Sequence, residues 1–102
     1  MLAAATTQFV LTLKGSCDLS SAVKITFNIK QGVVNLKKNA PDVVLSENNV
    51  VTVDLSQSDT LKFCEGYAFI QLNWLFSNGK RGGSKKKKIW IEGNLLQEEM
   101  SV

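Results

Sequence analysis

The chain has 102 residues, of which 44% are apolar and 21% charged, and 12 basic against 9 acidic residues give a net charge of +3. This size suits one domain with one core, because such a chain buries roughly two-thirds of its unfolded surface. The composition excludes a largely disordered chain. The absence of histidine excludes Ser–His or Cys–His catalysis and zinc sites that contain histidine.

The first residues carry no basic charge and no long apolar run, so they do not match a secretory signal, and no segment approaches the roughly 20 apolar residues of a membrane-spanning helix. We therefore expect folding in a reducing cytoplasm, without a membrane partner. Cys17 and Cys64 are predicted to lie in different loops as free, partly buried thiols. The sequence leaves open whether they are bridged.

The N-terminal half alternates apolar and polar residues with the period of two that is typical of β-strands. In 8–14 the apolar face is Phe9, Leu11 and Leu13, and 15–18 reads as a turn. In 23–30 the predicted inward residues are Val23, Ile25, Phe27 and Ile29. Short strands follow over 33–38 and 43–45. A hairpin turn at 47–49 is favoured because asparagine tolerates positive φ.

The second half continues with a strand over 51–55, a loop with one helical turn over 56–61 that begins at a Ser N-cap, and a long strand over 67–76. Its inward face is predicted to be Ala68, Ile70, Leu72 and Trp74. Asn78-Gly79 predicts a two-residue type I′ hairpin loop, and 85–92 returns as a strand. The pattern predicts an all-β fold, an antiparallel Ig-like β-sandwich of about seven strands. The single domain covers 1–102, with a core over about 7–96 and an acidic tail at 97–102 whose order stays open.

A basic cluster lies near the C-terminus, with six positive charges in nine residues and no acidic residue among them: Lys80, Arg81, Lys85, Lys86, Lys87 and Lys88. The rest of the chain carries six basic and nine acidic residues, so the positive charge is local. Three interpretations stay open. The lysines are a solvated hairpin that blocks edge-to-edge pairing, a docking surface for an acidic protein, or a phosphate or nucleic-acid patch.

Three aromatic residues are predicted on outward positions: Tyr67 and Phe69 on the long strand, and Trp90 beside the basic cluster. Exposed rings mark interaction sites, although a covering loop or burial on both faces would also explain them. The candidate docking residues are therefore Tyr67, Phe69, Trp90, Lys80, Arg81, Lys85, Lys86 and Lys88. Rings beside Asn and Gln also leave a small carbohydrate-binding sandwich as an alternative.

No motif for catalysis, a cofactor or a metal ion is recognised. The nine carboxylates are scattered over turns and strand ends, where they serve as caps and solvated tips, rather than paired as a hydrolase requires. Residues 79–85 lack the spacing and the strand–helix context of a phosphate-binding loop. We therefore expect that the chain is not an enzyme.

The order of these motifs resembles that of a family of small tail-associated proteins of phages and prophages of Gram-positive bacteria, similar to the N-terminal domain of siphophage upper baseplate proteins. The resemblance spans about residues 7–96 and is carried by the stretches Val23–Gly32, Asn49–Phe63, Ile70–Trp74, Asn78–Arg81 and Asn94–Leu96. It implies an Ig-like sandwich in the virion tail. The implied partners are other tail or baseplate proteins and copies of itself, as a trimer or ring.

Two features depart from that family. Upper baseplate proteins continue into a long helical, receptor-anchoring region that these 102 residues do not contain, so we expect no receptor-binding role here. The run Lys85–Lys88 is also richer in lysine than the family pattern. The main alternative function is a basic β-module that binds nucleic acid through the 80–88 hairpin, although nucleic acid is the less favoured partner.

Overall fold

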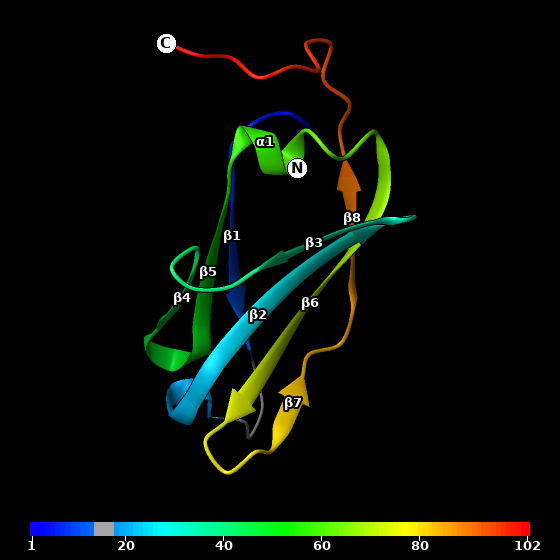
Figure 1. Cartoon of the computed structure of the whole chain (residues 1–102). Coiled ribbons are helices and arrows are strands. Elements are labelled where there is room, and N and C mark those ends of the chain that lie inside the picture. Colours follow the sequence, from blue (N-terminus) through cyan, green and yellow to red (C-terminus); the bar gives the residue numbers. More distant parts are fainter. Residues whose placement is uncertain (14–17) are drawn as a thin grey trace.

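A computed structural model describes residues 1–13 and 18–102, which form two antiparallel sheets packed face to face (Figure 1). The eight strands are β1 (Thr7–Thr12), β2 (Ala22–Gln31), β3 (Val34–Lys38), β4 (Val43–Ser46), β5 (Val50–Leu55), β6 (Gly66–Phe76), β7 (Arg81–Gly83) and β8 (Lys87–Ile91). Three single turns of helix join them: η1 (Leu19–Ser21), η2 (Glu47–Asn49) and α1 (Gln57–Thr60). The predicted all-β sandwich is confirmed, and β7 is a short strand that the sequence did not reveal.

One sheet has three strands in the order β1-β5-β4, and the other has five, with β3-β2-β6 followed by both β7 and β8. The last two strands share one edge of β6: β7 pairs with Asn73–Leu75, and β8 with Gly66–Ile70. Ser84 fills the gap between them, since its backbone N–H donates to the Leu72 carbonyl and its hydroxyl accepts from the Leu72 N–H, both at 2.9 Å. This edge of β6 therefore stays hydrogen-bonded along its length.

The core lies between the sheets because the period-two alternation turns one side of each strand inward. On β6 the residues Ala68, Ile70, Leu72 and Trp74 are all buried, as predicted, and Trp74 is only 8% exposed. They pack against the inner residues of the other strands: Phe27, Ile29, Leu36, Val43, Val51, Val53, Leu55 and Ile91. Each large side chain that is fully buried contributes about 1.5–3 kcal/mol, so this layer is the main source of stability.

The predicted orientation of Val23 is wrong. Its side chain is 63% exposed, because the pairing of β2 with β6 shifts register between Ala22 and Lys24. A bulge adds one residue to the strand and reverses the alternation on its far side. Ala22 therefore packs against the core, while the alternation predicted for Ile25 to Ile29 holds.

The hairpin between β6 and β7 forms where it was predicted, but its loop is not the two-residue type I′ loop. Gly79 has a φ of +85°, and Asn78 is not among the described residues with positive φ. The Gly79 N–H donates to the Phe76 carbonyl at 3.0 Å, and the Phe76 N–H donates to the Lys80 carbonyl at 2.9 Å. These bonds match the three-residue loop in which only the last residue, here Gly79, is left-handed.

The other predicted turns are confirmed where they can be seen. Asn48 and Asn49 both have positive φ, of 60° and 57°, at the turn into β5. Ser56 caps α1 in a capping box with Asp59, as its position before the helical turn indicated. The turn predicted over 15–18 falls almost wholly on residues 14–17, which lie outside the described part of the chain.

Candidate functional site

The five-stranded sheet has one face on the core and one face turned outward, and we call the second the outer face. Its residues come from all five strands and the link into β8: Lys24, Thr26, Asn28, Lys30, Asn35, Lys37, Tyr67, Phe69, Gln71, Asn73, Leu75, Arg81, Lys86, Lys88 and Trp90. Because side chains alternate along each strand, burial of Ala68 and Ile70 forces the neighbouring Tyr67 and Phe69 outward. Within the described part of the chain no loop shields these two rings, which are 58% and 47% exposed.

The three predicted aromatic residues gather at one end of the outer face. Tyr67 and Trp90 are paired directly across β6 and β8, with ring centroids 4.9 Å apart and an interplanar angle of 78°. The Lys88 ammonium lies 3.9 Å from the Tyr67 ring centroid, as a cation–π contact. These contacts hold Tyr67, Trp90 and Lys88 together. Trp90 is 43% exposed, so the cluster is still accessible to a partner.

The predicted basic cluster divides over several surfaces. Arg81, Lys86 and Lys88 reach the outer face, whereas Lys80 lies in the hairpin turn. Lys85 and Lys87 line a depression beside β1, on the side of the five-stranded sheet opposite to the outer face. Three of the predicted docking residues, Lys80, Arg81 and Lys85, are therefore not brought to the aromatic cluster, since Arg81 pairs with Leu75 at the other end of the outer face.

Three basic residues that the sequence interpretation missed complete the outer face: Lys24 and Lys30 from β2, and Lys37 from β3. The outward parity of 24–30 indicated the direction of Lys24 and Lys30, but only sheet pairing places these two beside β6 and Lys37 beside β2. The outer face thus carries six cationic side chains, and none of its strand residues is acidic. The nearest carboxylates along these strands, Glu65 and Glu92, lie just beyond the strand ends.

The outer face is hollowed at two adjoining places that share Asn28. A depression of about 470 Å³ is lined by Phe69, Lys30 and Lys86 with amide side chains between them. A second one, of about 370 Å³, is lined by Lys24, Lys37 and Arg81 around Asn73. Amide groups hold this floor in place, since Asn28 donates to Asn35 and Arg81 donates to Asn73, each at 3.2 Å. Such a surface suits an extended, negatively charged segment with apolar side chains.

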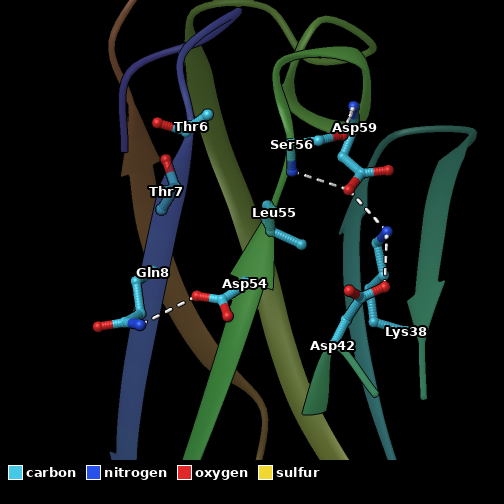
Figure 2. Close-up of a pocket in the computed structure, with 9 residues that line it drawn as sticks. All are labelled: Thr6, Thr7, Gln8, Lys38, Asp42, Asp54, Leu55, Ser56 and Asp59. Atoms are coloured by element: carbon cyan, nitrogen blue, oxygen red, sulfur yellow. Dashed lines mark hydrogen bonds and ion pairs between the residues drawn. The ribbon is translucent and has the colours of Figure 1, made fainter. Parts of the chain in front are cut away.

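Another depression, of about 690 Å³, lies at the end of the sandwich near α1 and is lined by three carboxylates (Figure 2). Asp54 accepts a hydrogen bond from the Gln8 amide at 3.0 Å. The Lys38 ammonium lies 2.7 Å from Asp59 and 3.4 Å from Asp42. Each of these three carboxylates thus has a hydrogen-bond or ion-pair partner.

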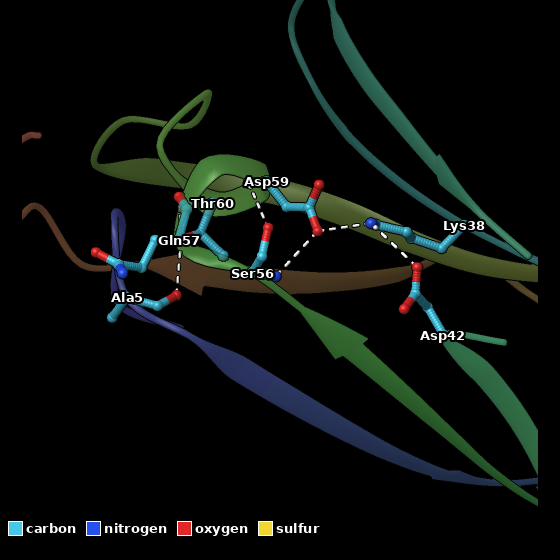
Figure 3. A network of polar contacts seen from close by, with 7 residues as sticks. All are labelled: Ala5, Lys38, Asp42, Ser56, Gln57, Asp59 and Thr60. Carbon is cyan, nitrogen blue, oxygen red and sulfur yellow. Dashed lines mark hydrogen bonds and ion pairs between the residues drawn. The ribbon is translucent and has the colours of Figure 1, made fainter. Parts of the chain in front are cut away.

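The contacts of Lys38 hold the two sheets together (Figure 3). Lys38 ends β3 in the five-stranded sheet, whereas Asp59 belongs to α1, which follows β5 of the three-stranded sheet. The Ser56 N–H donates to the Asp59 carboxylate at 2.9 Å, and the Asp59 N–H donates to the Ser56 hydroxyl at 3.2 Å. Thr60 extends the network by donating its hydroxyl to the Ala5 carbonyl at 2.7 Å. We interpret this depression as a structural clasp.

The charges of the clasp shift each other's protonation. The hydrogen bond to Asp59 raises the pKa of Lys38, and burial opposes it. Burial alone would raise the pKa of Asp59, but hydrogen bonds from Lys38 and Ser56 outweigh it and hold that pKa below its ordinary value. Both groups therefore stay charged through the neutral range.

Cys64 is exposed rather than partly buried as predicted, because it follows the buried Phe63 in the link between α1 and β6. Its backbone N–H donates to the Gln31 side chain at 3.0 Å. The other cysteine, Cys17, with which a bridge was left open, lies outside the described residues.

Within the described residues, no group of three or more His, Cys, Asp or Glu side chains is placed to hold a metal ion, and no helix is long and apolar enough to cross a membrane. Comparison of the chain with known protein families, with curated proteins and with solved structures finds no match.

Proposed function

We propose that this chain is a non-enzymatic structural module of a phage or prophage tail, and that it docks onto acidic protein surfaces through its outer face. The observation that carries the docking role is the combination of three half-exposed rings with six cationic side chains and no strand carboxylate on one sheet face. Aromatic residues and arginine are the usual anchors of protein interfaces. The assignment to a tail rests on the resemblance over about residues 7–96.

The arrangement of the rings favours a protein over a nucleic acid. Single-stranded nucleic acids stack their bases on free ring faces. Here Lys88 lies over the Tyr67 ring, at 3.9 Å from its centroid, and Trp90 packs edge-on against the same ring. Tyr67 and Trp90 therefore form one compact pair rather than two separate platforms, and a pair of this kind fits a pocket on a protein partner.

The tail assignment is tested with particles of the phage or induced prophage that encodes the chain. We expect mass spectrometry to find the chain in purified particles and immunogold electron microscopy to place it on the tail. Loss of the gene should leave particles with incomplete tails. Particles that assemble and infect normally without the chain would refute this assignment.

The docking role is tested in the same complementation assay with Lys30→Glu/Lys86→Glu, which reverses two charges around Phe69. We expect this variant to fold but to be absent from particles. The matched control is Lys80→Glu/Lys85→Glu, in which two exposed lysines away from the outer face change by the same charge. Equal incorporation of both variants would contradict docking through the outer face.

Nucleic-acid binding is the second candidate, favoured by the same six cationic side chains. It predicts that a fluorescent single-stranded DNA binds the chain with an affinity that falls steeply with salt, through counterion release. We expect no such binding at physiological salt. A salt-dependent affinity that is lost in Lys30→Glu/Lys86→Glu would replace the protein-docking proposal.

A further inference from the structure

The C-terminal segment 93–102 follows a defined path across the end of the sandwich (Figure 1). The Asn94 amide donates to the Ala3 carbonyl at 2.9 Å, and the Gln97 amide donates to the Leu61 and Phe63 carbonyls at 3.2 Å each. Met100 and Gln57 exchange two hydrogen bonds, of 2.8 and 2.9 Å, between backbone and amide groups. The segment thus leaves β8 in one sheet and is bound to α1, which follows the other sheet.

These contacts use backbone and amide groups, and they leave the apolar side chains of the segment without cover. Leu95 and Met100 are 109% and 67% exposed, and Leu96 is 43% exposed. Glu98 and Glu99 lie between them and are also exposed, and no basic residue follows Lys88 in this sequence. An ordered strip that exposes several apolar side chains beside two acidic groups has the character of one half of an interface.

The outer face supplies the complementary half. It places cationic side chains around the exposed rings of Tyr67, Phe69 and Trp90, and the segment places Glu98 and Glu99 among Leu95, Leu96 and Met100. We propose that the segment 93–102 of one copy docks on the outer face of a second copy of this chain. This inference rests on the proposed docking role of the outer face and names its partner.

The geometry favours a second copy over the same chain. The bonds of Met100 to Gln57 direct the segment toward the three-stranded sheet, away from its own outer face. Each copy then offers one segment and one face, so the contact is head-to-tail and builds a ring when the rotation closes.

The test is size-exclusion chromatography with light scattering on the whole chain over a concentration series. We expect the unchanged chain to self-associate. Two variants should each weaken association by roughly tenfold or more, because two attractive contacts become repulsive. They are the segment variant Glu98→Lys/Glu99→Lys and the face variant Lys30→Glu/Lys86→Glu. The control Glu47→Lys/Asp54→Lys makes the same charge change at exposed residues away from both surfaces and should associate normally.

Mixing the segment variant with the face variant should restore association, since a segment with reversed charges then meets a face with reversed charges. Circular dichroism confirms that each variant is folded. A chain that stays monomeric throughout, or a mixture that does not recover, overturns the inference. If the segment variant still enters particles while the face variant does not, the outer face docks on another protein, and the proposed function stands without a second copy.

Discussion

Replacing Lys38 by methionine removes the cation that joins the two sheets at the clasp. Lys38 and Asp59 have side chains that are only 18% and 11% exposed, and their charged atoms are 2.7 Å apart. Loss of one partner from a buried pair costs about 3–5 kcal/mol, against 0–1 kcal/mol for an exposed pair. Because the Ser56 N–H still solvates Asp59, we expect a loss of about 2–3 kcal/mol from the free energy of unfolding.

A loss of this size is large for the domain, whose total stability is on the order of 5–15 kcal/mol. It should lower the Tm by roughly 10–20 °C for a chain of about 100 residues. The assay is thermal and urea unfolding, followed by circular dichroism and by tryptophan fluorescence. The matched control is Lys37→Met, because Lys37 is the exposed neighbour on the same strand and should change stability by less than about 0.5 kcal/mol.

A double-mutant cycle isolates the contact between the two charges. Lys38→Met/Asp59→Asn should destabilise the domain by less than the sum of the two single substitutions, because removal of both charges leaves no unpaired buried ion. The reasoning is refuted if Lys38→Met is no more destabilising than Lys37→Met. Strict additivity of the single effects would also refute it.

Two further predictions concern a glycine and pH. Gly82→Ala should destabilise by about 1–3 kcal/mol in urea unfolding, because its new Cβ would meet the Trp74 ring, with Cε2 at 2.7 Å. In Gly83→Ala the tightest contact of the new Cβ is with Oδ1 at the end of the Asn73 side chain, at 2.9 Å, so this substitution should cost less, and equal losses would contradict this account. The stability gap between the unchanged chain and Lys38→Met should be constant from about pH 6 to 9. It should begin to shrink as the pH falls below about 4, the ordinary range of an Asp pKa, and be lost as the pH passes through the lowered pKa of Asp59; it should likewise begin to shrink above about pH 10.5 and be lost as the pH passes through the raised pKa of Lys38. A gap that does not shrink at all below about pH 4 would show that charge does not carry the effect.

Much of the fold was readable from local patterns. The alternation from Ala68 to Trp74 gave the correct buried face of β6, and Asn48 and Asn49 adopt the positive φ that their residue type favours. The Ser56 cap formed where its spacing indicated. These features depend on neighbours within a few residues, where side-chain alternation and backbone preference act directly.

The errors also have local causes that become visible only through pairing. Val23 is exposed because a bulge against β6 reverses the alternation, and a bulge is defined by two strands rather than by one. The loop at Asn78-Gly79 has three residues because the Phe76–Lys80 bonds set its length. The outward aromatic residues were predicted correctly, whereas the basic cluster divides between the outer face, the hairpin turn and the depression beside β1.

By itself, the sequence determined the strand pattern, the buried faces and the outward rings, because each depends on the period of a single strand. Only the tertiary structure decided that Lys24, Lys30 and Lys37 join Arg81, Lys86 and Lys88 on one face, and that Lys38 meets Asp59 in the clasp. The physical reason is that both arrangements depend on strand order and register. Hydrogen bonds between strands far apart in the chain set that order and register.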